Sequence, residues 1–228
     1  MNLKDRLQAI KLQISEACLQ AGRNPQEVEL LAVSKGHPAS TLRHMHELGM
    51  QRFGENYVPD MEAKALALKE LAISWVYIGH LQSNKIQRIV QVASEIQTVS
   101  SFKHANFIAR YAQELNKTPF PIYIAINADN EPQKSGVPMS AAAGLVSKIE
   151  NELPQLKIKG IMAIPSSAYS DKEDRAPPAV YKELRELANQ IGEHKLSLGM
   201  SGDLKLSIAA GSTCVRIGTA LFGERKAP

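Results

Sequence analysis

The sequence predicts an α/β fold: a single (β/α)8 TIM barrel preceded by one extra helix. Short apolar segments alternate regularly with longer amphipathic ones from residue 29 to residue 218, as they do in parallel βα units. Eight strand candidates can be distinguished, and seven of them precede a helical pattern. A doubly wound open sheet is the alternative, but no Gly-x-Gly-x-x-Gly phosphate loop follows the first strand.

The extra helix is predicted over residues 1–22, where apolar side chains recur every three or four positions and Gly22 gives a stop. Each predicted strand is a short apolar run. These runs lie at 29–34, 51–54, 74–78, 95–99, 121–127, 160–164, 196–200 and 213–218. Helical periodicity is found at 41–48, 61–71, 84–92, 102–115, 141–152, 180–193 and 204–210. The polar, proline-containing stretch 166–178 is predicted to be an exposed loop.

The composition is that of an ordinary globular chain, with 228 residues, 44% hydrophobic and 22% charged. A net charge of only +4 and the lack of a basic run argue against nucleic-acid binding. No stretch approaches the ~18 apolar residues of a membrane span. Cys18 and Cys214 lie far apart and are expected to be reduced, as in a cytoplasmic protein. Since no linker divides the chain, we expect one domain over residues 1–228.

Lys35 is the most informative residue, because it ends the first predicted strand and precedes Gly36-His37-Pro38. On position alone, a solvated loop lysine is the simpler interpretation. However, α/β barrels carry their chemistry at the carboxyl ends of their strands. A partly desolvated lysine there has a lowered pKa and can form a Schiff base with an aldehyde.

Polar and glycine residues after the last two strands are typical of an anion-binding site. Ser201 precedes a short helix and can offer a hydroxyl and an amide, while Gly218 and Thr219 offer unobstructed amides and a second hydroxyl. TIM barrels often bind phosphate at these two loops. Arg216, two residues before Gly218, should point to the same face and is either part of a salt-bridge layer or a donor to a ligand.

The remaining polar residues form no recognisable metal or nucleophile pattern. No His, Asp or Glu set has metal-ligand spacing, and no Gly-x-Ser-x-Gly turn is present. Trp75 is interpreted as a core residue. Five histidines are interpreted as surface or capping residues: His37, His44, His46, His104 and His194.

Seven segments in this order resemble the pyridoxal phosphate homeostasis proteins (the YggS/PROSC family), whose fold is similar to the barrel domain of bacterial alanine racemase. One segment alone would be weak, but seven in order from residue 31 to residue 223 are highly specific. They are Leu31-Ala-Val-Ser-Lys35, Phe53-Gly-Glu-Asn-Tyr57, Ile78-Gly-His-Leu-Gln-Ser-Asn-Lys85, Lys134-Ser-Gly136, Gly160-Ile-Met-Ala-Ile164, Leu198-Gly-Met-Ser201 with Asp203, and Ala209-Ala-Gly-Ser-Thr213 running on through Val215-Arg-Ile-Gly-Thr-Ala-Leu-Phe-Gly223.

The resemblance implies a fold of type III among proteins that bind pyridoxal 5′-phosphate (PLP). It implies that PLP is held as an internal aldimine, a Schiff base, on Lys35. It further implies that Ser201, Gly218 and Thr219 bind the phosphate. An aldehyde for the lysine and a phosphate for the anion site agree with the interpretation of the residues themselves.

The resemblance also implies that Arg216 faces the pyridine nitrogen, Asn56 lies near the ring and Met162 packs close by. Two positions depart from the family. Gly36-His37 replaces the more common Thr-Lys or a similar pair, although Pro38 is kept, and Gly202 stands where many relatives have a bulkier polar residue. The first departure could alter access to the site or the local pKa.

The arginine at position 216 favours a carrier over an enzyme. It cannot accept the proton of a pyridinium, so the ring would stay neutral and be a weaker electron sink. Racemases of this fold receive a tyrosine base from a second domain, for which we expect no room after Gly223. We therefore expect a monomeric PLP store that serves PLP-dependent client enzymes. The alternatives are a weak racemase using Tyr57 or His80, and a Schiff-base aldolase without PLP.

Overall fold

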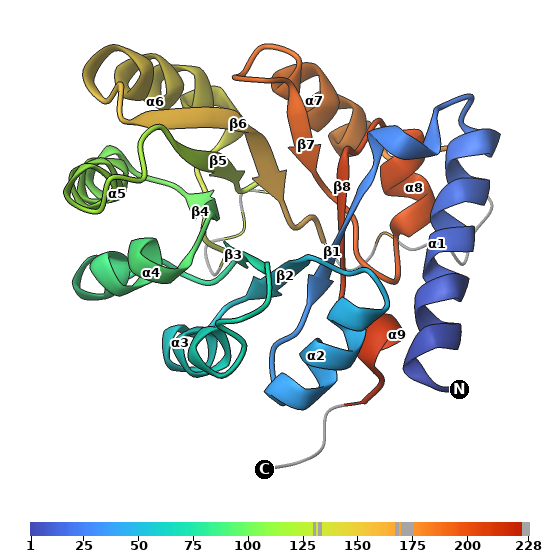
Figure 1. Ribbon diagram of the computed structural model, residues 1–228. Helices are drawn as coiled ribbons and strands as arrows, with labels where there is room; N and C mark the ends of the chain where they lie inside the picture. Colours follow the sequence, from blue (N-terminus) through green and yellow to red (C-terminus); the bar gives the residue numbers. More distant parts are fainter. Residues whose placement is uncertain (130, 132–133, 167–168, 170–175, 225–228) are drawn as a thin grey trace.

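The computed structural model describes residues 1–129, 131, 134–166, 169 and 176–224, and these form one closed barrel. Eight parallel strands run in the order β1 to β8, and β8 pairs with β1 to close the ring. The helices lie outside the strands (Figure 1). The predicted (β/α)8 barrel is thus confirmed, and the open-sheet alternative is wrong.

The strands coincide closely with the predicted apolar runs. Their bounds are β1 Glu29–Val33, β2 Arg52–Glu55, β3 Ser74–Tyr77, β4 Glu95–Val99, β5 Phe120–Ile126, β6 Leu156–Ala163, β7 Lys195–Ser197 and β8 Cys214–Ile217. Leu31 of β1 pairs with Arg216 of β8, and Ala32 pairs with Ile217. This register places the residues that follow β1 and β8 at the same rim of the barrel.

The helices follow the strands as the periodicity predicts. They are α1 Leu3–Gln20, α2 Ala39–Glu47, α3 Val58–Ala67, α4 Ile86–Val92, α5 Phe102–Glu114, α6 Met139–Glu152, α7 Ala179–Ala188, α8 Leu204–Ala209 and α9 Thr219–Phe222. Two short 3-10 turns, η1 Pro25–Glu27 and η2 Ser83–Lys85, complete the set. The extra helix α1 packs beside α8 and α9 through its buried apolar face (Figure 1).

Several predicted boundaries are displaced, and three of these displacements can be traced to particular residues. Helix α3 begins at Val58 instead of residue 61, because Pro59 is favourable in a first helical turn. Strand β6 begins at Leu156, where buried Leu156 and Ile158 alternate with outward lysines, a pattern typical of a strand. Helix α7 ends at Ala188 instead of residue 193, and Gly192 then packs against the Ile158 carbonyl.

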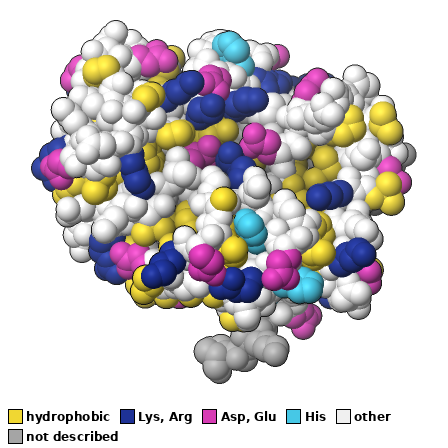
Figure 2. Space-filling model, viewed as in Figure 1, with side chains coloured by type: hydrophobic (Ala, Val, Ile, Leu, Met, Phe, Trp, Pro, Cys, Tyr) yellow, Lys and Arg dark blue, Asp and Glu magenta, His cyan; other side chains and the backbone are white. Residues whose placement is uncertain are grey.

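The core fills the barrel and the layer between strands and helices. Trp75 is buried and its ring lies 6.1 Å from that of Phe53, which confirms its predicted core position. Cys18 and Cys214 are both buried and free of disulfides. Most of the predicted loop 166–178 lies outside the described residues. On the face shown in Figure 2, charges of both signs are interspersed, as expected from the small net charge.

No helix among the described residues is long and apolar enough to cross a membrane. This finding agrees with the hydropathy of the sequence.

Two glycines provide a matched test of the packing around β6. A Cβ atom on Gly160 would lie 1.9 Å from the backbone oxygen of Lys195 in β7, whereas one on Gly144 in α6 would meet nothing within 4 Å. We expect Gly160→Ala to lower the free energy of unfolding by about 1–3 kcal/mol through overpacking. Gly144→Ala should raise it by up to about 1 kcal/mol, as in other helix interiors. Urea unfolding followed by circular dichroism measures both, and equal effects would contradict the described β6–β7 approach.

Candidate functional site

A cavity of about 450 Å³ lies at the carboxyl ends of the strands. It is bounded by the segments that follow β1, β2, β3, β6, β7 and β8. Six of the seven predicted site residues line it: Lys35, Asn56, Ser201, Arg216, Gly218 and Thr219. The topology thus brings together side chains that are up to 184 residues apart in the sequence.

Lys35 is half-buried and stands two residues after the end of β1. The backbone before it is fixed, because the Ser34 amide donates to the Gly54 carbonyl (3.0 Å) and the Ser34 carbonyl accepts from the His37 amide (3.1 Å). Gly36 takes a φ of 76°, which glycine adopts without strain. The tight turn therefore directs the lysine into the cavity.

A buried ion pair supports the end of β1 from below. The Lys64 ammonium donates to Glu55 Oε1 (2.6 Å) and to the Ser34 carbonyl (3.0 Å), and the Ser34 hydroxyl donates to the same Glu55 oxygen (2.6 Å). Burial raises the pKa of the Glu55 carboxyl, against the opposing hydrogen bonds and charge of Lys64 and Ser34. This pair could not be predicted from the sequence, because charged residues in helices and strands are usually exposed.

Arg216 is a buried cation that points into the barrel mouth. Its Nη1 donates to Ser197 Oγ (2.7 Å) and its Nη2 donates to the Ala163 carbonyl (2.7 Å). Burial lowers the pKa of this guanidinium, although an arginine stays protonated in proteins. Within the described part of the chain, no carboxylate forms an ion pair with it.

A chain of hydrogen bonds runs from Arg216 down through the barrel interior. The Ser197 hydroxyl donates to Gln97 Oε1 (2.7 Å), and Gln97 Nε2 donates to Glu95 Oε1 (2.8 Å). The same Glu95 oxygen accepts from Arg52 Nη2 at 3.0 Å. Each donor has one acceptor in this chain, so the orientation of every group is fixed.

The segment after β7 is organised by Asp203 and not by Ser201. The Asp203 carboxylate accepts from the Met200 amide (2.7 Å), the Tyr181 hydroxyl (2.6 Å) and the Ser207 hydroxyl (3.2 Å). Ser201 precedes helix α8 as predicted, but Asp203 occupies the position directly before the helix. Ser201 is instead exposed in the turn and lines the cavity.

The segment after β8 reaches the cavity through Gly218 and the short helix α9. A Cβ atom on Gly218 would lie 3.3 Å from the Val33 carbonyl oxygen, so the narrow space beside β1 favours glycine. Gly218 directly precedes α9, and the first amides of a helix have no partner within it. The Thr219 hydroxyl lies beside these amides at the exposed rim.

Two site residues differ from the sequence-based interpretation. His37, predicted to be a surface or capping residue, lines the cavity, and its ring stacks on that of Phe222 with the ring centroids 4.9 Å apart. Met162 is buried in the floor of a neighbouring cavity, while Ile164, two residues on, lines the cavity of Lys35. A strand alternates its side chains between faces, so residues 162 and 164 share one face but lie at different depths.

The cavity also has apolar walls, formed by residues that were not predicted to belong to the site: Val33, Ile78, Ile164 and Met200. Isolated apolar residues at strand ends look like core in a sequence, which explains why they were missed. The two bases considered for a racemase lie elsewhere among the described residues. Tyr57 is 55% exposed and does not line this cavity, and His80 Nδ1 is hydrogen-bonded to Ser135 Oγ (3.0 Å).

These features define a class: an α/β-barrel protein with a lysine, a buried arginine and segments rich in hydroxyls and backbone amides at one rim. Comparison with known proteins identifies the family. The model of the alanine racemase N-terminal domain family matches residues 6–226. The chain is 36% identical to the pyridoxal phosphate homeostasis protein of Pseudomonas aeruginosa, covering 98% of this chain and 96% of that protein. It is 35% identical to the Escherichia coli protein of the same name, covering 98% and 97%.

Solved structures agree with this result. PipY of Synechococcus elongatus, solved without PLP, superposes with a TM-score of 0.82 at 30% identity, covering 97% of this chain and all of PipY. PipY with PLP bound gives a TM-score of 0.78. Alanine racemase of Clostridium difficile shares the fold at 14% identity and a TM-score of 0.69, and 57% of that chain is covered. The chain therefore belongs to the pyridoxal phosphate homeostasis protein family.

The hydrogen-bond chain in the barrel interior predicts that replacing Gln97, its central residue, lowers the stability of the protein. In Gln97→Leu, the hydroxyl of Ser197 and one oxygen of Glu95 lose partners in a buried setting, so the free energy of unfolding should fall by about 1–3 kcal/mol. The matched control is Gln113→Leu, which removes an exposed hydrogen bond to Gln155 and should cost less than about 0.5 kcal/mol. Urea denaturation measures both. Equal costs would contradict the chain.

The buried Lys64–Glu55 pair predicts a pH-dependent effect. Lys64→Met removes the charge and the hydrogen bond of Lys64, which oppose the effect of burial, so the pKa of Glu55 should rise further in the folded state. A carboxyl whose pKa is higher in the folded than in the unfolded state stabilises the fold at pH values below its unfolded-state pKa. This stabilisation is lost as the pH rises through its folded-state pKa. The variant should therefore lose about 3–5 kcal/mol near pH 8 and less near pH 5.

Unfolding free energies measured from pH 5 to pH 8 test this, with Lys11→Met on the exposed face of α1 as control. A cost for Lys64→Met that stays constant over this range would contradict a buried Glu55 charge.

Proposed function

We propose that this protein binds pyridoxal 5′-phosphate as a Schiff base on Lys35 and acts in PLP homeostasis by storing the cofactor and delivering it. The observation that supports this most is the single cavity shared by Lys35, Arg216 and the Ser201–Gly218–Thr219 rim. The relatives named pyridoxal phosphate homeostasis protein and the PLP-bound PipY structure support the same assignment.

The residues present fit this cofactor. An aldehyde requires an amine, and Lys35 supplies one on a rigid turn. A phosphate requires clustered donors, which the hydroxyls of Ser201 and Thr219 and the amides before α9 can supply. Gly218 leaves room for an anion to approach the backbone. Asn56 reaches the same space because Gly79 lets the backbone pass close, as a Cβ there would lie 2.3 Å from the Asn56 oxygen.

Arg216 is assigned to the pyridine nitrogen of the cofactor. It is a donor that cannot accept a proton, so it would hold the ring nitrogen unprotonated. PLP supplies an electron sink when bound, and this sink is strongest with a protonated ring. The hydrogen bonds to Ser197 and Ala163 keep the guanidinium in one orientation. The arrangement favours retention of the aldehyde over turnover.

We propose a carrier or regulator instead of a catalyst for a second reason. Neither Tyr57 nor His80 lines the cavity of Lys35 among the described residues, which leaves the racemase alternative without a placed second base. We further propose one domain over residues 1–228, a monomeric state, a cytoplasmic location and PLP-dependent enzymes as recipients. The aldolase alternative requires no PLP and would leave the protein colourless.

The deciding measurement is the visible absorbance of the protein incubated with PLP, followed by borohydride reduction and peptide mass mapping. We expect a Schiff-base band and a reduced pyridoxyl group on Lys35. Lys35→Ala should lose that band, whereas Lys85→Ala, which changes another lysine near the same end of the barrel, should keep it. A wild-type protein that stays colourless would contradict the proposal. Amino-acid turnover by the loaded protein would support the racemase alternative.

A further inference from the structure

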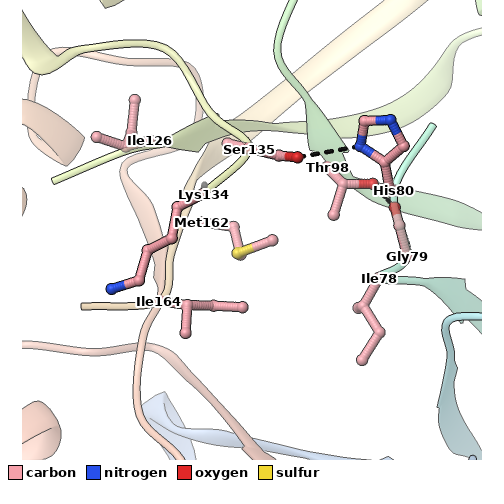
Figure 3. A pocket seen from close by; sticks show the side chains of 10 residues that line it. Ile78, Gly79, His80, Thr98, Ile126, Lys134, Ser135, Met162 and Ile164 are labelled. Atoms are coloured by element: carbon pink, nitrogen blue, oxygen red, sulfur yellow. Dashed lines mark hydrogen bonds between the residues drawn. The ribbon is translucent and has the colours of Figure 1, made fainter. Parts of the chain in front are cut away.

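A second cavity of about 250 Å³ adjoins the cavity of Lys35. It lies between the segments that follow β3 and β5 and the carboxyl-terminal parts of β4, β5 and β6 (Figure 3). Ile78 and Ile164 line both cavities. None of the groups assigned to PLP anchoring or phosphate binding lines it; Met162 forms part of its floor. This apolar cavity is therefore open to a further ligand beside the cofactor.

The surface of the apolar cavity is set by hydrophobic side chains. They are Ile78, Ala125, Ile126, Met162 and Ile164. Ala125, Ile126 and Met162 are buried, whereas Ile164 is 45% exposed. A ligand that covered Ile164 would gain hydrophobic free energy.

The polar groups of the apolar cavity already have partners. The Thr98 hydroxyl donates to the Gly79 carbonyl (2.7 Å), and His80 and Ser135 are hydrogen-bonded to each other, as Figure 3 shows. The Lys134 ammonium is paired with Glu131 (2.6 Å) and Asp129 (3.3 Å). No group in the described lining thus requires a polar partner from a ligand, and the cavity selects for an apolar group.

Size and charge narrow the ligand class further. A cavity of about 150 Å³ can hold benzene, so 250 Å³ accommodates an apolar group of about six carbons. Lys134 faces two carboxylates, which gives this rim a net charge of −1 and disfavours an acid as the recognised end. In the proposed function, the neighbouring cavity holds PLP, and the aldehyde group of PLP reacts with primary amines.

We propose that the apolar cavity binds the hydrophobic group of a small primary amine, with the amine end directed towards the cavity of Lys35. Both apolar α-amino acids and simple aliphatic amines have this chemistry. The assignment of the amine end rests on the proposed function, whereas the assignment of the apolar end rests on the cavity alone. The site would let the protein distinguish amines by the size of their apolar group.

The test is isothermal titration of the PLP-loaded protein with L-leucine, 3-methylbutylamine, glycine and 4-methylpentanoate, together with saturation-transfer NMR of the ligand methyl groups. We expect the first two to bind at least about tenfold more tightly than glycine, because additional methylenes in an apolar pocket are discriminated by this factor or more. Strong saturation of the methyl protons should accompany binding. Tighter binding of L-leucine would identify the ligand class as α-amino acids, and tighter binding of 3-methylbutylamine would identify it as aliphatic amines. Either preference supports the proposal.

Two variants fill the cavity without changing an assigned cofactor residue. Ser135→Phe enters from an exposed position and Ala125→Leu from the floor, and each should weaken L-leucine binding at least about tenfold. Ser147→Phe, on the exposed face of α6, is the control and should leave binding unchanged.

Three outcomes would overturn the inference. The first is equal affinity for glycine and L-leucine, and the second is 4-methylpentanoate binding as tightly as the amines. The third is unchanged L-leucine affinity in Ser135→Phe and in a folded Ala125→Leu variant. The PLP band of the same samples is recorded separately. Its presence without selective amine binding would refute only the apolar cavity, while its absence would refute the proposed function.

Discussion

The pairing of β8 with β1 is the interaction on which the rest of this structure depends. It closes the sheet and places Leu31 beside Arg216, so the segments after the first and last strands meet at one rim. Without it, Lys35 and Gly218 would lie on opposite edges of an open sheet. Closure also removes the unpaired strand edges that an open sheet exposes. The topology of the barrel therefore determines which segments meet at the site, whatever side chains those segments carry.

The protein also accommodates buried charge, both inside the barrel and between the strands and helix α3. Arg216, Glu95, Lys64 and Glu55 are all buried, and each buried charge costs free energy unless it is paired or hydrogen-bonded. The interior meets this cost with shared partners: one oxygen of Glu95 serves both Gln97 and Arg52, and one oxygen of Glu55 serves both Lys64 and Ser34. These groups hold the ends of β1 and β8, from which the candidate site residues emerge.

Much of the fold and the positions of six site residues could be predicted, because strand and helix periodicities differ and barrel chemistry gathers at strand ends. The apolar wall formed by Ile78 and Ile164 could not, since an apolar residue at a strand end looks like core. The His37 stacking and the role of Asp203 depend on contacts between distant segments. Helix α9 has only four residues, too few to show a period.

The lack of a carboxylate partner for Arg216 among the described residues has a kinetic consequence. Arg52 is paired with both Glu95 and Glu29, whereas Arg216 donates to the neutral Ser197 hydroxyl and Ala163 carbonyl. A positive charge in low-dielectric surroundings projects its field out of the barrel mouth with little screening. Dianionic molecules should consequently be drawn to this end of the barrel before any contact forms, and raised ionic strength should slow their capture.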